Sequence, residues 1–215
     1  MTTPNTNKKT LVGISADAVR SVDVARGALP YASWHENAKY LSAASGEHYK
    51  LLATVAAAYR GGRFYDVGTY LGHSALALAH GWEELGNRVI SYDIADCFAS
   101  PEALTAERSI KAHAGIELRV RDALEDVEEI ARSADVVLLD VTPHDGKQER
   151  VFVDALVRHG FKGLLLLDDI HLNEDMTALW QWIPAARKVD LTEVGHWSGT
   201  GVAAFDPEGT ADVDF

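Results

Sequence analysis

The sequence predicts a doubly wound α/β fold, in which helices cover both faces of a mostly parallel β-sheet. Three observations predict it. Short apolar runs alternate with helical patterns from about residue 45 to residue 184, which is the order that parallel strands with crossover helices require. The first run ends in a glycine turn that leads directly into a helix, an arrangement at which α/β proteins bind nucleotides. Two more strand patterns follow near the C-terminal end, so seven strands are expected.

The N-terminal part has the least regular pattern. Residues 1–10 are rich in Thr, Asn and Lys and are expected to be disordered. Residues 11–44 are expected to form a helical cap on the main domain, which would span residues 45–215. The first clear helix is predicted to begin with Ser45 as its N-cap, to present apolar residues on one face and to end at Gly61-Gly62.

The central stretch is residues 63–80, with the sequence RFYDVGTYLGHSALALAH. A short strand leads to Asp66 and Gly68, and a tight turn through Gly72 leads into a helix that begins at Ser74. Glycines let the backbone come close to a ligand, and the helix N-terminus presents unpaired N–H groups to it. A dinucleotide-binding turn would have the pattern G-x-G-x-x-G, which this stretch lacks. Asp66 would suit a cationic ligand group and would repel a pyrophosphate.

The remaining elements continue the alternation. The runs at 134–140 and 163–169 are largely apolar, as in strands that are buried on both faces, whereas residues 116–120 alternate. Glycines and prolines mark helix ends, with Pro101 in the first turn of one helix. Strands are predicted at residues 64–67, 89–94, 116–120, 134–140, 163–169, 188–195 and 201–205, and helices at 74–82, 101–113, up to about 133, 148–159 and 173–182.

Acidic residues end three of the predicted strands. Asp93 ends the second strand, where an acid can accept hydrogen bonds from both hydroxyls of a ribose. Asp140 ends the fourth strand, and Asp168 and Asp169 end the fifth. The carboxyl ends of parallel strands share one crevice, and three acids there would repel one another without a cation between them. Because Mg²⁺ prefers oxygen ligands, these last three residues are predicted to hold Mg²⁺ or a similar divalent cation.

The sequence DVGTYLGHSALALA resembles the first motif of class I S-adenosylmethionine (SAM) methyltransferases. Its G-x-x-x-G-x-S form is most similar to small metal-dependent O-methyltransferases of the catechol and caffeoyl-CoA type and their bacterial relatives. The resemblance runs from about Ser45 to Asp206. It implies a Rossmann-like doubly wound sheet of seven strands, mostly parallel, with a C-terminal antiparallel strand. Residues 11–44, which include Trp34, would then form a lid over the substrate.

The resemblance also implies a site for SAM. The glycine turn would cradle the methionine part, Asp93 would bind the ribose, and Asp122 would approach the exocyclic amino group of the adenine. The family has a glycine before this last acid, where this sequence has Arg121. The expected SAM-binding residues are Asp66, Gly68, Thr69, Tyr70, Gly72, Ser74, Asp93, Ile94, Asp122, Ala123 and Asp140.

The reaction implied by the resemblance is methyl transfer to a hydroxyl of a small molecule with adjacent oxygens. In catechol-type enzymes an Asp after strand four and an Asp-Asn pair after strand five hold the metal, and Asp169 replaces the Asn here. A general base would assist, and a histidine titrates near neutral pH. His144 is the first candidate and His171 the second, while Lys147 is less well placed.

The composition narrows the class of protein further. A formal net charge of −12 argues against a nucleic-acid partner and against an anionic membrane surface. Cys97 is the single cysteine, and neither a signal peptide nor an apolar run of bilayer length is visible, so a soluble cytoplasmic protein is expected. A homodimer through the last strands or the N-terminal segment is an expectation from the family alone.

Three alternatives stay open at this point. A metal-independent methyltransferase of the same fold would use the acids to orient the substrate or to cap strands. An NAD-dependent oxidoreductase would bind NAD(H), which Asp66 and the missing G-x-G-x-x-G disfavour. A noncatalytic SAM-binding protein would bind SAM without turning over any hydroxyl substrate.

Overall fold

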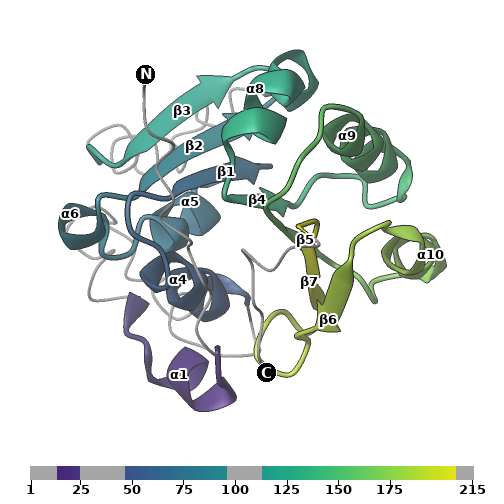
Figure 1. Cartoon of the computed structure of the whole chain (residues 1–215). Helices are drawn as coiled ribbons and strands as arrows, with labels where there is room; N and C mark the ends of the chain where they lie inside the picture. Colours follow the sequence, from purple (N-terminus) through teal and green to yellow (C-terminus); the bar gives the residue numbers. More distant parts are fainter. Residues whose placement is uncertain (1–13, 25–46, 96–112, 207–215) are drawn as a thin grey trace.

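The computed structural model describes residues 14–24, 47–95 and 113–206. Its centre is a seven-stranded sheet with the order β3-β2-β1-β4-β5-β7-β6 (Figure 1). Strands β1 to β5 pair in parallel, and β7 is antiparallel to both of its neighbours, β5 and β6. The predicted sheet with a C-terminal antiparallel strand is therefore confirmed. The strands are β1 (Arg63–Val67), β2 (Arg88–Asp93), β3 (Ile116–Val120), β4 (Val136–Leu139), β5 (Leu164–Asp168), β6 (Arg187–Asp190) and β7 (Thr200–Ala204).

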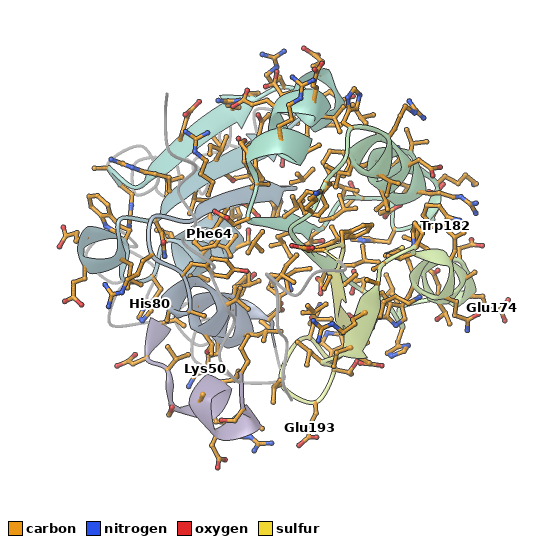
Figure 2. The ribbon with its side chains drawn as sticks, in the orientation of Figure 1. Lys50, Phe64, His80, Glu174, Trp182 and Glu193 are labelled. Carbon is orange, nitrogen blue, oxygen red and sulfur yellow. The ribbon has the colours of Figure 1, made fainter. Side chains whose placement is uncertain are left out.

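Helices cover both faces of this sheet. They are α1 (Ala16–Ser21), α4 (Tyr49–Ala57), α5 (His73–Leu78), α6 (Trp82–Leu85), the 3₁₀ helix η2 (Ala123–Asp126), α8 (Val127–Ser133), α9 (Lys147–Arg158) and α10 (Glu174–Trp182). Side chains alternate between the faces of a strand, so Phe64 and Leu138 pack with α1, α4 and α5, whereas Tyr65 and Leu165 pack with α8, α9 and α10 (Figure 1). Figure 2 shows Phe64 in the interior and Glu174 pointing outward from α10.

The register of the central strands places the predicted site residues at one edge of the sheet. Val67 at the end of β1 pairs with Leu139, and Leu139 pairs with Leu167 of β5. The residues that follow these positions, Gly68, Asp140 and Asp168, therefore lie side by side where the strands end. Strands β4 and β5 are buried along their whole length, as their apolar sequences predict.

Three element boundaries differ from the prediction. The helix predicted from residue 74 to 82 divides into α5 and α6, because Gly81 between them has a φ of 70°. The strand predicted at 188–195 ends at Asp190, because the Gly195 N–H donates to the carbonyl of Leu191 at 2.7 Å and closes a turn. The helix predicted from Ser45 begins at Tyr49 in α4.

Several expectations concern residues outside the described ranges. They are the disordered tail at 1–10, Trp34 and the rest of the lid at 25–44, the N-cap at Ser45, Cys97 and the helix at 101–112. Within the expected cap, α1 packs on α4: Val19 is fully buried in the shared core, and Lys50 Nζ donates to the carbonyl of Arg20 at 2.8 Å. Among the described residues, none of the helices has the length and apolar character needed to cross a bilayer.

Candidate active site

The turn after β1 requires a glycine. Gly68 has a φ of 106°, and a Cβ at this position would lie 1.6 Å from the carbonyl oxygen of Asp140. The N–H groups of Gly68 and Thr69 both donate to the carbonyl of Tyr92 at 2.9 Å, which ties the turn to the end of β2. Gly72 has a φ of 78° and immediately precedes α5. The turn therefore lies in direct backbone contact with the residue that follows β4.

Asp66 is fully buried near the end of β1. Its Oδ2 accepts a hydrogen bond of 2.5 Å from the Ser91 hydroxyl, which is itself 2.6 Å from Thr69 Oγ1. Its Oδ1 has no hydrogen-bond partner. Burial raises the pKa of Asp66 to about 6, although hydrogen bonds from Ser91 and Ser74 lower it. A buried carboxylate with one free oxygen favours a cationic partner.

Asp93 holds the glycine turn against the end of β2. Its Oδ2 accepts from the Tyr70 N–H at 2.9 Å, and its Oδ1 accepts from the Ala95 N–H at 3.0 Å. Tyr70 and Ile94 lie beside it with 68% and 78% of their surface exposed. Two exposed apolar residues next to a half-buried acid are suited to a ligand with both polar and apolar parts. The ribose role of Asp93 stays a prediction.

Asp122 and Ala123 lie where β3 leads into η2. The exposed Asp122 side chain caps this helix by accepting from the Leu124 N–H at 2.9 Å, and Ala123 is buried. Arg121, which stands where the family has glycine, pairs with Glu125 at 2.7 Å. The approach of Asp122 to an adenine likewise stays a prediction.

Asp168 is buried at the end of β5 between two histidines. His48 Nδ1 lies 3.0 Å from its Oδ1, an ionic contact rather than a well-directed hydrogen bond, and His196 Nδ1 lies 3.2 Å from its Oδ2. Thr200 Oγ1 also donates to Oδ1 at 3.2 Å. Burial alone would raise the pKa of Asp168, but His48 and His196 hold it far below its usual range. Both oxygens of this predicted metal ligand therefore contact imidazole rings.

The two histidines are charged in this arrangement. Burial lowers the pKa of His48, but Asp168 raises it to about 9 overall. For His196, burial again lowers the pKa, and its hydrogen bonds with Asp168 and Asp169 raise it to about 10. Two imidazolium groups therefore neutralise part of the acid cluster in the absence of a metal.

Asp169 contacts a different histidine. Its Oδ1 accepts from the hydroxyl of Ser198, and its Oδ2 lies 3.3 Å from His144 Nδ1. Asp169 and His144 have left-handed φ values of 59° and 58°, a conformation that is uncommon for non-glycine residues. Asp140, His144 and Asp169 each offer a ligand atom, and these atoms lie within 4.8 Å of one another.

Asp140, which follows β4, is partly buried. Burial, followed by repulsion from Asp168, raises its pKa to about 7. The three predicted metal ligands belong to two adjoining groups of ligand atoms. Asp140 and Asp169 lie with His144, and Asp168 lies with His48 and His196, whose Nδ1 is also 3.4 Å from Asp169 Oδ1.

The other predicted bases lie apart from these groups. His171 Nε2 is 2.6 Å from Asp190 Oδ2 on β6, and the side chain of His171 lines a surface pocket with residues of α10. Lys147 is exposed and pairs with Asp145 at 3.1 Å. Of the three candidates, His144 is the one in contact with a predicted metal ligand.

Sequence reasoning missed the residues that surround Asp168. His48 is at the N-cap of α4, and His196, Ser198 and Thr200 lie in or next to the connection between β6 and β7. The polar stretch HWSGT between two strand patterns was the available signal. In the sequence alone, this stretch is indistinguishable from an ordinary loop. Its proximity to the acids follows from the antiparallel pairing of β7 with β5, which brings Thr200 opposite Asp168.

The sheet order, the glycine turn after β1 and the acid at the end of β2 are those of the class I methyltransferases. Residues 66–170 match the model of a family described as a methyltransferase domain. Residues 66–170 of the chain are therefore similar to a methyltransferase domain, in agreement with the family that the sequence resembles. Comparison with curated proteins gives no match.

Solved structures share this fold at low sequence identity. A protein from Corynebacterium glutamicum has a TM-score of 0.58 and 19% identity, over 86% of this chain and 91% of that one. An SAH-bound methyltransferase from Podospora anserina has a TM-score of 0.56 and 15% identity, over 86% and 88%. An O-methyltransferase from Bacillus cereus in complex with SAH has a TM-score of 0.55 and 16% identity, over 86% and 91%.

Proposed function

We propose that this protein transfers a methyl group from SAM to a hydroxyl of a small molecule with two adjacent oxygens, assisted by a divalent cation. The observation that carries the proposal is the backbone contact between the glycine turn and the acid site, since a Cβ on Gly68 would lie 1.6 Å from the Asp140 carbonyl oxygen. A methyl donor on the turn and an acceptor at the acids would thus be neighbours, as direct transfer requires. The SAH in two of the similar structures is what SAM becomes after it gives up its methyl group.

SAM would lie over the ends of β1 and β2. The free oxygen of Asp66 would face its ammonium group, and Asp93 would accept hydrogen bonds from its ribose. The exposed side chains of Tyr70 and Ile94 would pack against the adenosine part. Methyl transfer is an in-line displacement, so holding the sulfonium rigidly in this place is a large part of the catalysis.

The group of Asp140, His144 and Asp169 fits a divalent cation. Two carboxylates and one imidazole offer ligand atoms within 4.8 Å of one another, and a cation there would relieve the repulsion that helps to raise the pKa of Asp140 to about 7. His144 takes the place that the sequence assigned to Asp168, because His48 and His196 contact both oxygens of Asp168. When bound, the cation would act as a Lewis acid on the acceptor hydroxyl.

A metal-independent reaction is the second candidate, and the histidines favour it. His48 and His196 already place two cations beside Asp168, so the acid cluster does not require a metal to offset its charge. His144, whose side chain is 19% exposed and lies against Asp169, would then accept the proton of the acceptor hydroxyl.

Two measurements test the proposal and separate the candidates. Calorimetric titration of SAM, with Mg²⁺ and with EDTA, should give micromolar binding in both solutions. Catechol should then be methylated with Mg²⁺ and not with EDTA, and phenol, which lacks the second oxygen, is the matched control substrate. Methylation of both compounds in EDTA would favour the metal-independent reaction. Binding of NAD(H) without SAM would refute methyl transfer.

A further inference from the structure

A compact group of three ligating side chains adjoins the proposed catalytic cation group and shares no residue with it. His48 comes from the N-cap of α4, Asp168 from the end of β5 and His196 from the connection between β6 and β7. Their ligand atoms lie within 4.8 Å of one another. His48 Nδ1 is 3.0 Å from one carboxylate oxygen, and His196 Nδ1 is 3.2 Å from the other. Two other segments of the chain thus converge on the carboxylate at the end of β5.

The spacing and the chemistry of these atoms suit a small divalent ion. Ligands at Zn–N and Zn–O distances of about 2.1 Å lie about 3.4 Å apart around a tetrahedral ion. The separations of 3.0 Å and 3.2 Å, each to a different oxygen of Asp168, are a little shorter than this value. Two imidazole nitrogens and one carboxylate favour Zn²⁺ and its neighbours over Mg²⁺, which prefers oxygen. His48 is 2% exposed, and its Nδ1 has no hydrogen-bond partner, so a buried nitrogen points at the carboxylate without a directed bond.

A second carboxylate orients one of the histidines. Glu47 Oε2 lies 3.5 Å from His196 Nε2, while His196 Nδ1 faces Asp168. Histidines that bind metals usually hold their other ring nitrogen against a carboxylate or carbonyl, which selects the tautomer and fixes the ring. Glu47 is suited to this supporting role.

We propose that His48, Asp168 and His196 form a second cation site that binds a borderline divalent ion such as Zn²⁺ in preference to Mg²⁺. The site shares no ligand with the group of Asp140, His144 and Asp169, although His196 Nδ1 also lies 3.4 Å from Asp169 Oδ1. It does not depend on the proposed methyl transfer. Binding would release the protons that His48 and His196 carry in the metal-free protein, and a divalent ion in each group would then balance the four carboxylates of Glu47, Asp140, Asp168 and Asp169. The ion would also tie α4 and the β6–β7 connection to β5.

Co²⁺ tests the site because its visible spectrum reports nitrogen ligation and low coordination number. The whole chain is first freed of metal by EDTA and dialysis. Titration of this protein with Co²⁺ should give a visible absorption that reaches a plateau, and one equivalent of Zn²⁺ should abolish it. Mg²⁺ in hundredfold excess should leave that spectrum unchanged. His196→Gln and His48→Gln should each weaken Co²⁺ binding at least tenfold. Because His48 is buried, far-UV circular dichroism must show that the His48→Gln variant folds. If that variant does not fold, Co²⁺ binding by His196→Gln, at a half-buried residue, decides the test.

Two matched variants locate the ion. His144→Gln alters the proposed catalytic cation group, and His171→Gln alters an exposed histidine outside both groups, so both should keep the Co²⁺ spectrum. Displacement of Co²⁺ by Mg²⁺, an unchanged spectrum in His196→Gln, or loss of the spectrum in His144→Gln would overturn the assignment. SAM binding, measured on the same samples, separates this result from the proposed function.

Discussion

The ionic contact between His48 and Asp168 should make the metal-free protein less stable as the pH rises above neutral. Burial lowers the pKa of His48, but the Asp168 carboxylate 3.0 Å away raises it from 6.5 to about 9 overall. The folded protein therefore binds this proton more tightly than the unfolded chain does. The resulting stabilisation is fully present below about pH 6.5 and is lost as the pH rises through about 9.

The size of the effect follows from the two pKa values. A difference from 6.5 to about 9 corresponds to about 3 kcal/mol of unfolding free energy. This is a large part of the stability of an ordinary domain. Because His48 is 2% exposed, solvent screens the contact little.

Urea unfolding in EDTA, at about pH 6.5 and about pH 9.5, measures the effect. Other groups also titrate over this range, so the informative quantity is the difference between the wild type and His48→Gln. The wild type should lose about 3 kcal/mol more than the variant over this interval. Equal losses in the two proteins would show that His48 is neutral in the folded state and would refute the reasoning.

Three substitutions test the remaining assignments. Gly68→Ala should weaken SAM binding more than tenfold, because the added Cβ would lie 1.6 Å from the backbone carbonyl oxygen of Asp140 and the turn must move; unchanged affinity by calorimetry would contradict the assigned place of the cofactor. Asp93→Ala should also weaken SAM binding more than tenfold by removing the ribose acceptor and the carboxylate that holds the Tyr70 N–H at 2.9 Å. If SAM affinity were retained, Asp93 would have no cofactor role. Asp140→Asn should abolish the stimulation of turnover by Mg²⁺. Because Asp140 has a folded-state pKa of about 7, its ionised form is disfavoured in the folded protein, so the same substitution should raise the unfolding free energy above about pH 7. Lower stability at pH 8 in thermal melts would count against this account of its charge.

Local patterns predicted most of the fold. The alternation at Ile116–Val120 gave the bounds of β3 as the structure has them, and the apolar runs before Asp140 and Asp168 correctly placed β4 and β5. The predictions of β4 and β5 succeed because a strand buried on both faces needs apolar residues at consecutive positions. The break between α5 and α6 was missed, since a single glycine is compatible with both a helix interior and a turn.

The sequence by itself determined the class of the protein and the edge of the sheet at which its chemistry lies. A glycine turn after the first strand and acids after the second, fourth and fifth strands are local signals, and the parallel register brings Gly68 and Asp140 together. Only the tertiary structure decided which side chains neutralise those acids. His48 and His196 reach Asp168 from distant segments, one at a helix N-terminus and one in a strand connection. No local periodicity specifies that contact, because it depends on how α4 and the antiparallel β7 pack around the end of β5.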